Sequence, residues 1–193
     1  MNTVVGILFN TRRTFQKLDG EFIDDLNVKT SVIFCVSGLA AGIQATMEEW
    51  KYFIEYFIEP TFWSTALSLL ASCAIGLVIG RYIVSQVLFK IGKALKGKAD
   101  IIDVIVVTAY SSIPMLVEVP ITFYKVVILK GNLTNWDYVI LNGLNLIAWG
   151  LSIKILIQGL RDFNGFGTLK AVITISPLIL LPILIYSLVY LLA

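Results

Sequence analysis

Histidine is absent from all 193 residues of the sequence. The chain therefore lacks the side chain that most often serves as a general base and as a transition-metal ligand. Only two cysteines are present, Cys35 and Cys73, and two thiols alone cannot build a four-ligand zinc site. Both lie inside apolar runs, so we interpret them as small buried side chains rather than as a redox pair. We expect no metal site and no cofactor.

Motifs of the common enzyme classes are missing as well. The sequence contains no glycine-rich phosphate loop and no nucleophile with a base at a usable spacing. The stretch NGFG at residues 164–167 is better interpreted as a turn between two helices than as a phosphate-binding loop. These absences predict a protein with no catalytic residues and no enzymatic activity.

Charged residues are scarce, at 15% of the chain, whereas 58% of the residues are hydrophobic. This balance lies far outside that of a soluble domain and indicates an integral membrane protein. The net charge of +2 is too small to indicate a nucleic-acid partner. Apolar runs of about 20 residues are long enough to cross a bilayer, and in lipid they must form helices to satisfy their backbone. We therefore predict an all-α polytopic protein with a bundle of five transmembrane helices.

Five apolar runs define the expected membrane domain, residues 28–193. The spans are expected at residues 28–46, 62–89, 101–129, 137–160 and 169–193. The second and third exceed the roughly 20 residues that a span needs, which allows for tilt, a kink or an extension beyond the membrane surface.

Residues 1–27 form the expected cytoplasmic or interfacial segment. Within it Phe15, Leu18, Phe22 and Leu26 recur at helical spacing, with basic residues on the other faces. This pattern predicts a short amphipathic helix on the membrane surface, with packing against loops as the alternative.

Basic residues are distributed unevenly over the expected loops. Ten Lys and Arg residues fall on one side of the membrane, and only Lys51 and Lys130 fall on the other. By the positive-inside rule the N-terminus is cytoplasmic and, with five spans, the C-terminus lies outside. Four of the ten residues make up what we call the basic loop: Lys90, Lys93, Lys96 and Lys98. This loop is a candidate contact for anionic lipid headgroups, with a merely solvated loop as the alternative.

Small residues recur at every fourth position of the second span. They make up what we call the small-residue ridge: Ser64, Ser68, Ser72, Gly76 and Gly80. Such a ridge lets a partner backbone approach closely. The first span offers a matching pair, Gly38 and Gly42. We predict that these two spans pack together within one chain, with a homodimer contact as the alternative.

The order of these features resembles that of the Yip (Ypt-interacting-protein) family of multispanning membrane proteins. The similarity rests on RRTF near the N-terminus, GKALKGKAD leading into a span with AYSSIP, and AWGLSIKILIQGLRDFNGFGTLKA before a final apolar helix. In eukaryotes the family is associated with small Rab-type GTPases and vesicle traffic. The resemblance therefore implies a role of the membrane-trafficking type.

The chain departs from the eukaryotic pattern, since it has no long cytosolic N-terminal domain and no DLYGP motif. This argues against GTPase binding and points to a prokaryotic member in an inner or cell membrane. We expect a non-enzymatic membrane organiser or adaptor. Its expected partners are membrane lipids, with other membrane proteins or a second copy of the chain as the further candidates.

Ionisable residues at membrane depth are costly, by ~2.5 to 3.5 kcal/mol at the bilayer centre, so each needs a partner or a function. Asp103 enters the third span at its cytoplasmic end, and Lys154 of the fourth span lies at a similar depth. We predict a structural ion pair between them. A functional switch is one alternative, and a lysine that extends to the headgroups is another.

Glu118 lies roughly 25 Å along the third span, at the depth of two asparagines of the fourth. Tyr110 and Pro114 precede it by two turns and one turn, so all three share a helix face. Prolines free backbone carbonyls that could line a polar cavity. We therefore predict an intramembrane polar site made of Tyr110, Ser111, Pro114, Glu118, Asn142 and Asn145. Such a site is either structural or the centre of a small-solute or ion transporter or channel, which is the alternative function.

Overall fold

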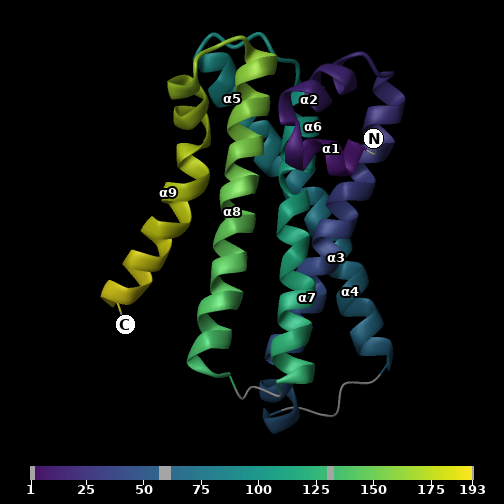
Figure 1. The fold of residues 1–193 in the computed structure, drawn as a ribbon, viewed down its shortest axis with the longest axis vertical. Coiled ribbons are helices and arrows are strands. Elements are labelled where there is room, and N and C mark those ends of the chain that lie inside the picture. Colours follow the sequence, from purple (N-terminus) through teal and green to yellow (C-terminus); the bar gives the residue numbers. More distant parts are fainter. Residues whose placement is uncertain (1–2, 57–61, 130–132, 193) are drawn as a thin grey trace.

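A computed structural model of the protein describes residues 3–56, 62–129 and 133–192 (Figure 1). All regular structure in these residues is helical, which confirms the all-α class. The elements are α1 (Thr3–Phe9), α2 (Thr11–Asp19), α3 (Ile23–Tyr56), α4 (Phe62–Leu77), η1 (Val78–Val84), α5 (Ser85–Ala94), α6 (Ile101–Ser111), η2 (Ile113–Val117), α7 (Glu118–Phe123), η3 (Tyr124–Ile128), α8 (Asn135–Asn164) and α9 (Thr168–Leu192).

Four helical segments of the described chain are long and apolar enough to cross a membrane. They are Ile23–Met47, Thr65–Ala94, Ile101–Ile128 and Asn135–Asn164. These segments confirm a multispanning membrane protein and coincide with the first four predicted spans. The fifth predicted span corresponds to α9, of which Thr168–Leu180 counts as a shorter apolar helix.

The second and third spans are continuous but not uniform helices. The second runs through α4, the π-helix η1 and α5, and the third through α6, the 3₁₀-helix η2, α7 and the π-helix η3. Pro114 lies at the beginning of η2. Since proline cannot donate to the carbonyl four residues earlier, the backbone tightens, and Met115 N donates to Ser112 O at 3.1 Å.

The small-residue ridge packs against α3 within the chain, as predicted for three of its members. A Cβ atom on Gly76 would overlap the backbone of Gly38, and one on Gly80 would overlap the ring of Phe34. Ser72 also packs on α3. A Cβ atom on Gly38 would overlap the carbonyl oxygen of Ser72, and one on Gly42 would overlap its side chain. Ser68 is exposed, and the side chain of Ser64 lies outside the described part of the chain.

The largest apolar core lies at what we call the basic end of the bundle, where α1, α2 and the basic loop are found (Figure 1). Phe15 and Leu18 of α2 are buried in this core beside Leu160 of α8. The Phe15 ring meets that of Phe163 edge-on, with centroids 5.7 Å apart. The apolar face of the N-terminal segment therefore packs on protein.

The predicted single amphipathic helix is wrong at its C-terminal part. The helix α2 ends at Asp19, and α3 begins at Ile23. Phe22 therefore lies in the turn between them and is 82% exposed. Leu26 is buried as expected, but on α3.

NGFG forms the predicted turn between α8 and α9. The helix α8 ends at Asn164, and Gly165 follows with φ of 65°, a left-handed conformation that glycine adopts without strain. Asn164 is buried against Gly92 and Gly97, and its carbonyl accepts from Lys98 N at 3.2 Å. This turn therefore fastens the basic loop to the end of α8.

Candidate functional site

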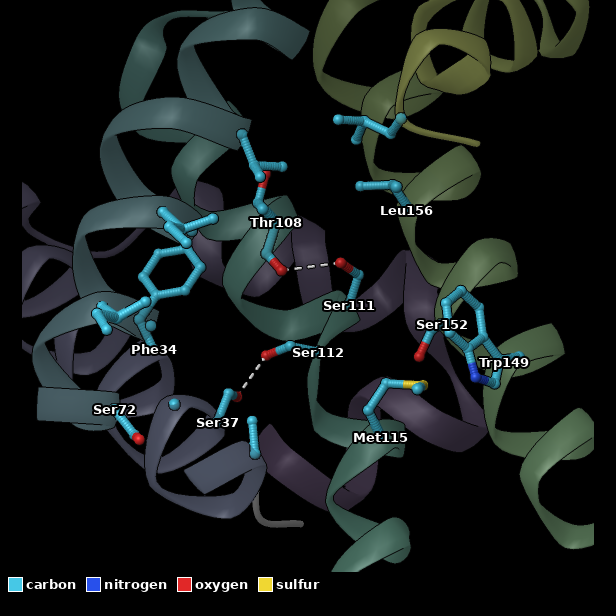
Figure 2. A pocket seen from close by; sticks show the side chains of 18 of the residues that line it. Phe34, Ser37, Ser72, Thr108, Ser111, Ser112, Met115, Trp149, Ser152 and Leu156 are labelled. Carbon is cyan, nitrogen blue, oxygen red and sulfur yellow. Dashed lines mark hydrogen bonds between the residues drawn. The ribbon is translucent and has the colours of Figure 1, made fainter. Parts of the chain in front are cut away.

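A cavity of about 610 Å³ lies between the helices at the depth of the predicted spans (Figure 2). We call it the bundle cavity. Its lining comes from residues 34–45 of α3, 72–84 of α4 and η1, 108–115 of α6 and η2, 149–156 of α8 and 175–179 of α9. The volume is within the range of small-molecule sites in proteins.

The bundle cavity opens sideways, toward the region that lipid occupies. Ile75, Ile79, Trp149 and Ile179 line it and are also exposed on the outer surface of the bundle. All four belong to apolar helices, and α9 diverges from α8 toward its C-terminal end (Figure 1). The cavity is therefore open at the apolar surface of these helices.

Hydroxyl groups on the cavity wall are mostly satisfied by nearby protein atoms. Ser111 Oγ donates to Thr108 O at 2.8 Å, and Ser37 Oγ and Ser112 Oγ share a hydrogen bond of 2.8 Å (Figure 2). Ser152 Oγ is the exception on the described wall, because it is buried and has no hydrogen-bond partner. The wall therefore behaves as a largely apolar surface.

A smaller cavity of about 90 Å³ adjoins the first, and we call it the Glu118 cavity. The two cavities share four lining residues: Ser37, Ala41, Ser112 and Met115. Glu118 and Gln44 complete the polar part of the smaller lining. The Ser37–Ser112 hydrogen bond therefore lies on the boundary between an apolar space and a polar one.

The predicted intramembrane polar site is divided rather than brought together. Ser111 lines the bundle cavity, whereas Tyr110 is 2% exposed and belongs to the apolar core. Pro114 is buried at the beginning of η2. Glu118 lines its cavity with residues of α3, and the expected partners on α8 are not part of that lining.

Helix winding explains this difference. A 3₁₀-helix turns about 120° per residue and an α-helix about 100°, so the five residues of η2 rotate Glu118 by roughly 100° from the predicted face. Asn142 is half-buried on α8, and Asn145 has a buried Oδ1 with no hydrogen-bond partner.

The predicted Asp103–Lys154 ion pair is wrong. Asp103 accepts a hydrogen bond from Asp100 N at 2.7 Å, as part of a capping box at the beginning of α6. Lys154 is exposed on α8. The ion pairs among the described residues are instead Lys29–Glu21 and Arg161–Asp162. Asp103 lines a small pocket with Phe163, nine residues from Lys154 on α8, so the two charges lie at different depths. The capping interaction is also local and needs no partner from another helix.

Arg81 is a polar residue that our sequence analysis missed. It lies on η1 and makes four hydrogen bonds to three residues of α3, Asn27, Thr30 and Ser31. The available signal was a single arginine in the middle of the second apolar run, since charges at such positions usually have a specific function.

A family model described as the Yip1 domain matches residues 5–190. The chain belongs to the Yip1 domain family. The comparisons with curated proteins and with solved structures gave no match. The match covers both cavities, the basic loop and the N-terminal helices, so all of them are parts of the Yip1 domain.

In this Yip1-domain protein the four lysines of the basic loop are exposed. Exposed Arg12, Arg13 and Lys17 of α2 lie at the same end of the bundle. Lys170 fastens the loop to α9 by donating to Leu95 O at 3.2 Å. Contact of the loop with anionic headgroups stays a prediction.

The two cysteines of the Yip1 domain are half-buried neighbours. Cys35 of α3 and Cys73 of α4 are free thiols that lie near each other at the contact between the two helices. Across the described residues, no group of three or more Cys, Asp or Glu side chains is placed to hold a metal ion.

Proposed function

We propose that this Yip1-domain protein is a non-enzymatic organiser of the membrane that acts through contacts inside the bilayer. Its partners in this proposal are lipid molecules and other membrane proteins. The bundle cavity carries the proposal, because it is apolar, large enough for a ligand and open toward lipid. A partner would reach it by lateral diffusion in the membrane.

The proposal includes five spans, with α9 as the fifth. The 25 residues of α9 would reach about 37 Å at 1.5 Å per residue, more than the hydrocarbon core requires. The basic end would then face the cytoplasm, in the cell membrane of a prokaryote, and the C-terminus would lie outside.

Thiol labelling tests this orientation. In a variant without Cys35 and Cys73, a cysteine at Ala94 of the basic end should be protected from an impermeant reagent in intact cells. A cysteine at Leu133, at the opposite end, should react. Both positions are exposed in the described structure. The opposite labelling pattern would refute the orientation.

A transporter or channel centred on Glu118 finds no support in the described part of the chain. The Glu118 cavity, at about 90 Å³, has room for only a few water molecules. The larger space beside it is apolar, which suits a hydrocarbon chain better than a hydrated solute. We therefore favour the organiser over the transporter.

A cavity-filling substitution tests the proposed function. Ala41→Trp fills the bundle cavity from α3, whereas Ala74→Trp adds the same side chain at an exposed position of α4 outside the cavity lining. Protein purified in mild detergent should retain a membrane molecule in native mass spectrometry. Ala41→Trp should remove it, and Ala74→Trp should not.

Retention that is identical in the two tryptophan variants would mean that the cavity holds no partner. Solute flux in proteoliposomes that Glu118→Gln abolishes would favour the transporter instead.

A further inference from the structure

The charge of Arg81 has no carboxylate partner among the described residues. Nη1 donates to Ser31 Oγ at 2.8 Å and, at 3.3 Å each, to Thr30 Oγ1 and Asn27 O. Nη2 donates to Asn27 Oδ1 at 2.7 Å. All these acceptors are neutral. A cation within a span normally has a counter-charge or lies in contact with headgroups, so an anion is expected beside this guanidinium.

The N–H groups of Arg81 that do not contact α3 show where that anion would bind. A guanidinium carries five N–H groups. The contacts to α3 use both hydrogens of Nη1 and one of Nη2, which leaves Nε–H and the second hydrogen of Nη2. The atoms Nε and Nη2 form one edge of the planar group. Such a fork matches two oxygens of a phosphate.

The position of Arg81 in the fold connects this fork with the bundle cavity. Gly80, the preceding residue, and Val84, three residues on, both line the cavity. On α3 the positions that hold the guanidinium, Asn27 and Ser31, share a helix face with Phe34 and Gly38, which also line it. The fork therefore lies at the basic end of the same helix pair that forms the cavity wall.

The dimensions fit a lipid. Asn27 is the fifth residue of the Ile23–Met47 span, at the end of that span that lies at the basic end of the bundle. The cavity wall on α3 begins at Phe34, about 10 Å further along the helix and near the middle of that span, and it continues to Ala45, about 16 Å beyond at 1.5 Å per residue. A lipid with an anionic headgroup at Arg81 and an apolar chain in the bundle cavity would supply the counter-charge of the guanidinium and fill the apolar space.

We propose that Arg81 binds the phosphate of a membrane phospholipid whose acyl chain lies in the bundle cavity. This inference rests on the proposed function, because it names the lipid class and the residue that anchors it. The π-helix η1 contributes by placing Arg81 toward α3 while Gly80 and Val84 face the cavity.

Native mass spectrometry of the purified, delipidated full chain tests the ligand. Phosphatidylglycerol should bind at least about tenfold more tightly than a diacylglycerol with the same acyl chains, since only the former offers a charge-assisted pair to Arg81. Excess inorganic phosphate should not displace the lipid, because a free anion gains nothing from the cavity. Equal binding of diacylglycerol would overturn the phosphate site, and displacement by phosphate would show a free-anion site instead.

Substitutions test the anchor. Arg81→Gln should weaken phosphatidylglycerol binding about tenfold, and Arg81→Lys should have an intermediate effect, since lysine keeps the charge without the fork. Lys154→Gln is the matched control, because it removes a positive charge that is exposed on another helix, and it should leave binding unchanged. Wild-type affinity in Arg81→Gln would overturn the proposal. If Arg81→Gln does not fold, the proposal is tested by comparing phosphatidylglycerol with diacylglycerol on the wild-type chain.

The cavity part of the inference has a separate outcome. Ala41→Trp should weaken phosphatidylglycerol binding while leaving Arg81 and its contacts to α3 in place. Undiminished binding would place the acyl chain elsewhere and refute that part. A lipid that Ala41→Trp expels and Arg81→Gln retains would show that the anchor is wrong while the proposed use of the cavity stands.

Discussion

The two ends of this bundle are built differently. At the basic end, helices from the beginning, middle and end of the chain meet in one core that buries Phe15, Leu88 and Leu160. Toward the other end α8 and α9 diverge, and Gly143 and Gly150 of α8 have open space where a side chain would be (Figure 1). The protein therefore has a closed half that fixes the fold and an open half that offers surface to the membrane.

The largest effect is expected at the contact that joins the two halves along α3 and α4. Gly76→Leu places a branched side chain against the backbone of Gly38, which cannot move aside as a side chain could. We expect loss of the folded bundle, seen as a collapse of thermal stability in detergent. Ile75→Leu on the exposed side of α4 is the control. Unchanged stability and oligomeric state of Gly76→Leu would mean that this contact does not form.

Removal of a core aromatic from the N-terminal helices should have the next largest effect. Phe15→Ala should destabilise the protein by about 3 to 5 kcal/mol, as is typical for a fully buried phenylalanine. Phe22→Ala, at a position that is 82% exposed, should change stability little. Equal effects in chemical unfolding experiments would mean that α2 lies on the membrane surface and not in the core.

A pair of glycines on α8 compares the two halves directly. A side chain on Gly159 would overlap Val107 and Phe15, so Gly159→Leu should cost about 1 to 3 kcal/mol or more. Gly143→Leu meets no neighbour in the described structure and should be neutral or slightly stabilising, because leucine favours the helix. Thermal unfolding of both variants measures the difference. A destabilising Gly143→Leu would show that the open half is filled.

The smallest effect is expected at Asp103, and it tests whether this residue caps α6 or forms an ion pair with Lys154. Asp103→Ala should cost about 1 kcal/mol through loss of the capping box at α6. Lys154→Ala should cost nothing measurable, since Lys154 is exposed. A double-mutant cycle with a coupling free energy near zero is expected. A large coupling free energy between Asp103 and Lys154 would mean that the two side chains do form an ion pair, which would contradict the structure.

The fold class could be predicted because a bilayer permits few structures. Apolar runs long enough to cross it must be helical, and four of the predicted spans coincide with observed segments. The contact between Gly38 and Gly76 was also predictable, because small residues repeated along two helices let their backbones approach closely. The turn at Gly165 follows from local backbone chemistry in the same way.

The candidate site was harder to predict because it depends on rotation about helix axes. Depth can be counted from the sequence, but the face that Glu118 presents depends on the winding of η2, which periodicity alone does not give. The amphipathic pattern of α2 is the same whether its apolar face contacts lipid or protein. Arg81 was missed because its acceptors on α3 are neutral residues that carry no charge pattern.

The core at the basic end has a consequence for synthesis of the protein. Phe15 emerges early from the ribosome, but Phe163, the ring it packs against, is made almost 150 residues later. At typical translation rates of about 5 to 20 residues per second, this delay is roughly 7 to 30 s. During that time the apolar face of α2 lacks α8, the helix that it packs against in the folded protein, so the nascent chain needs another shelter for this face, at the membrane surface or in a chaperone.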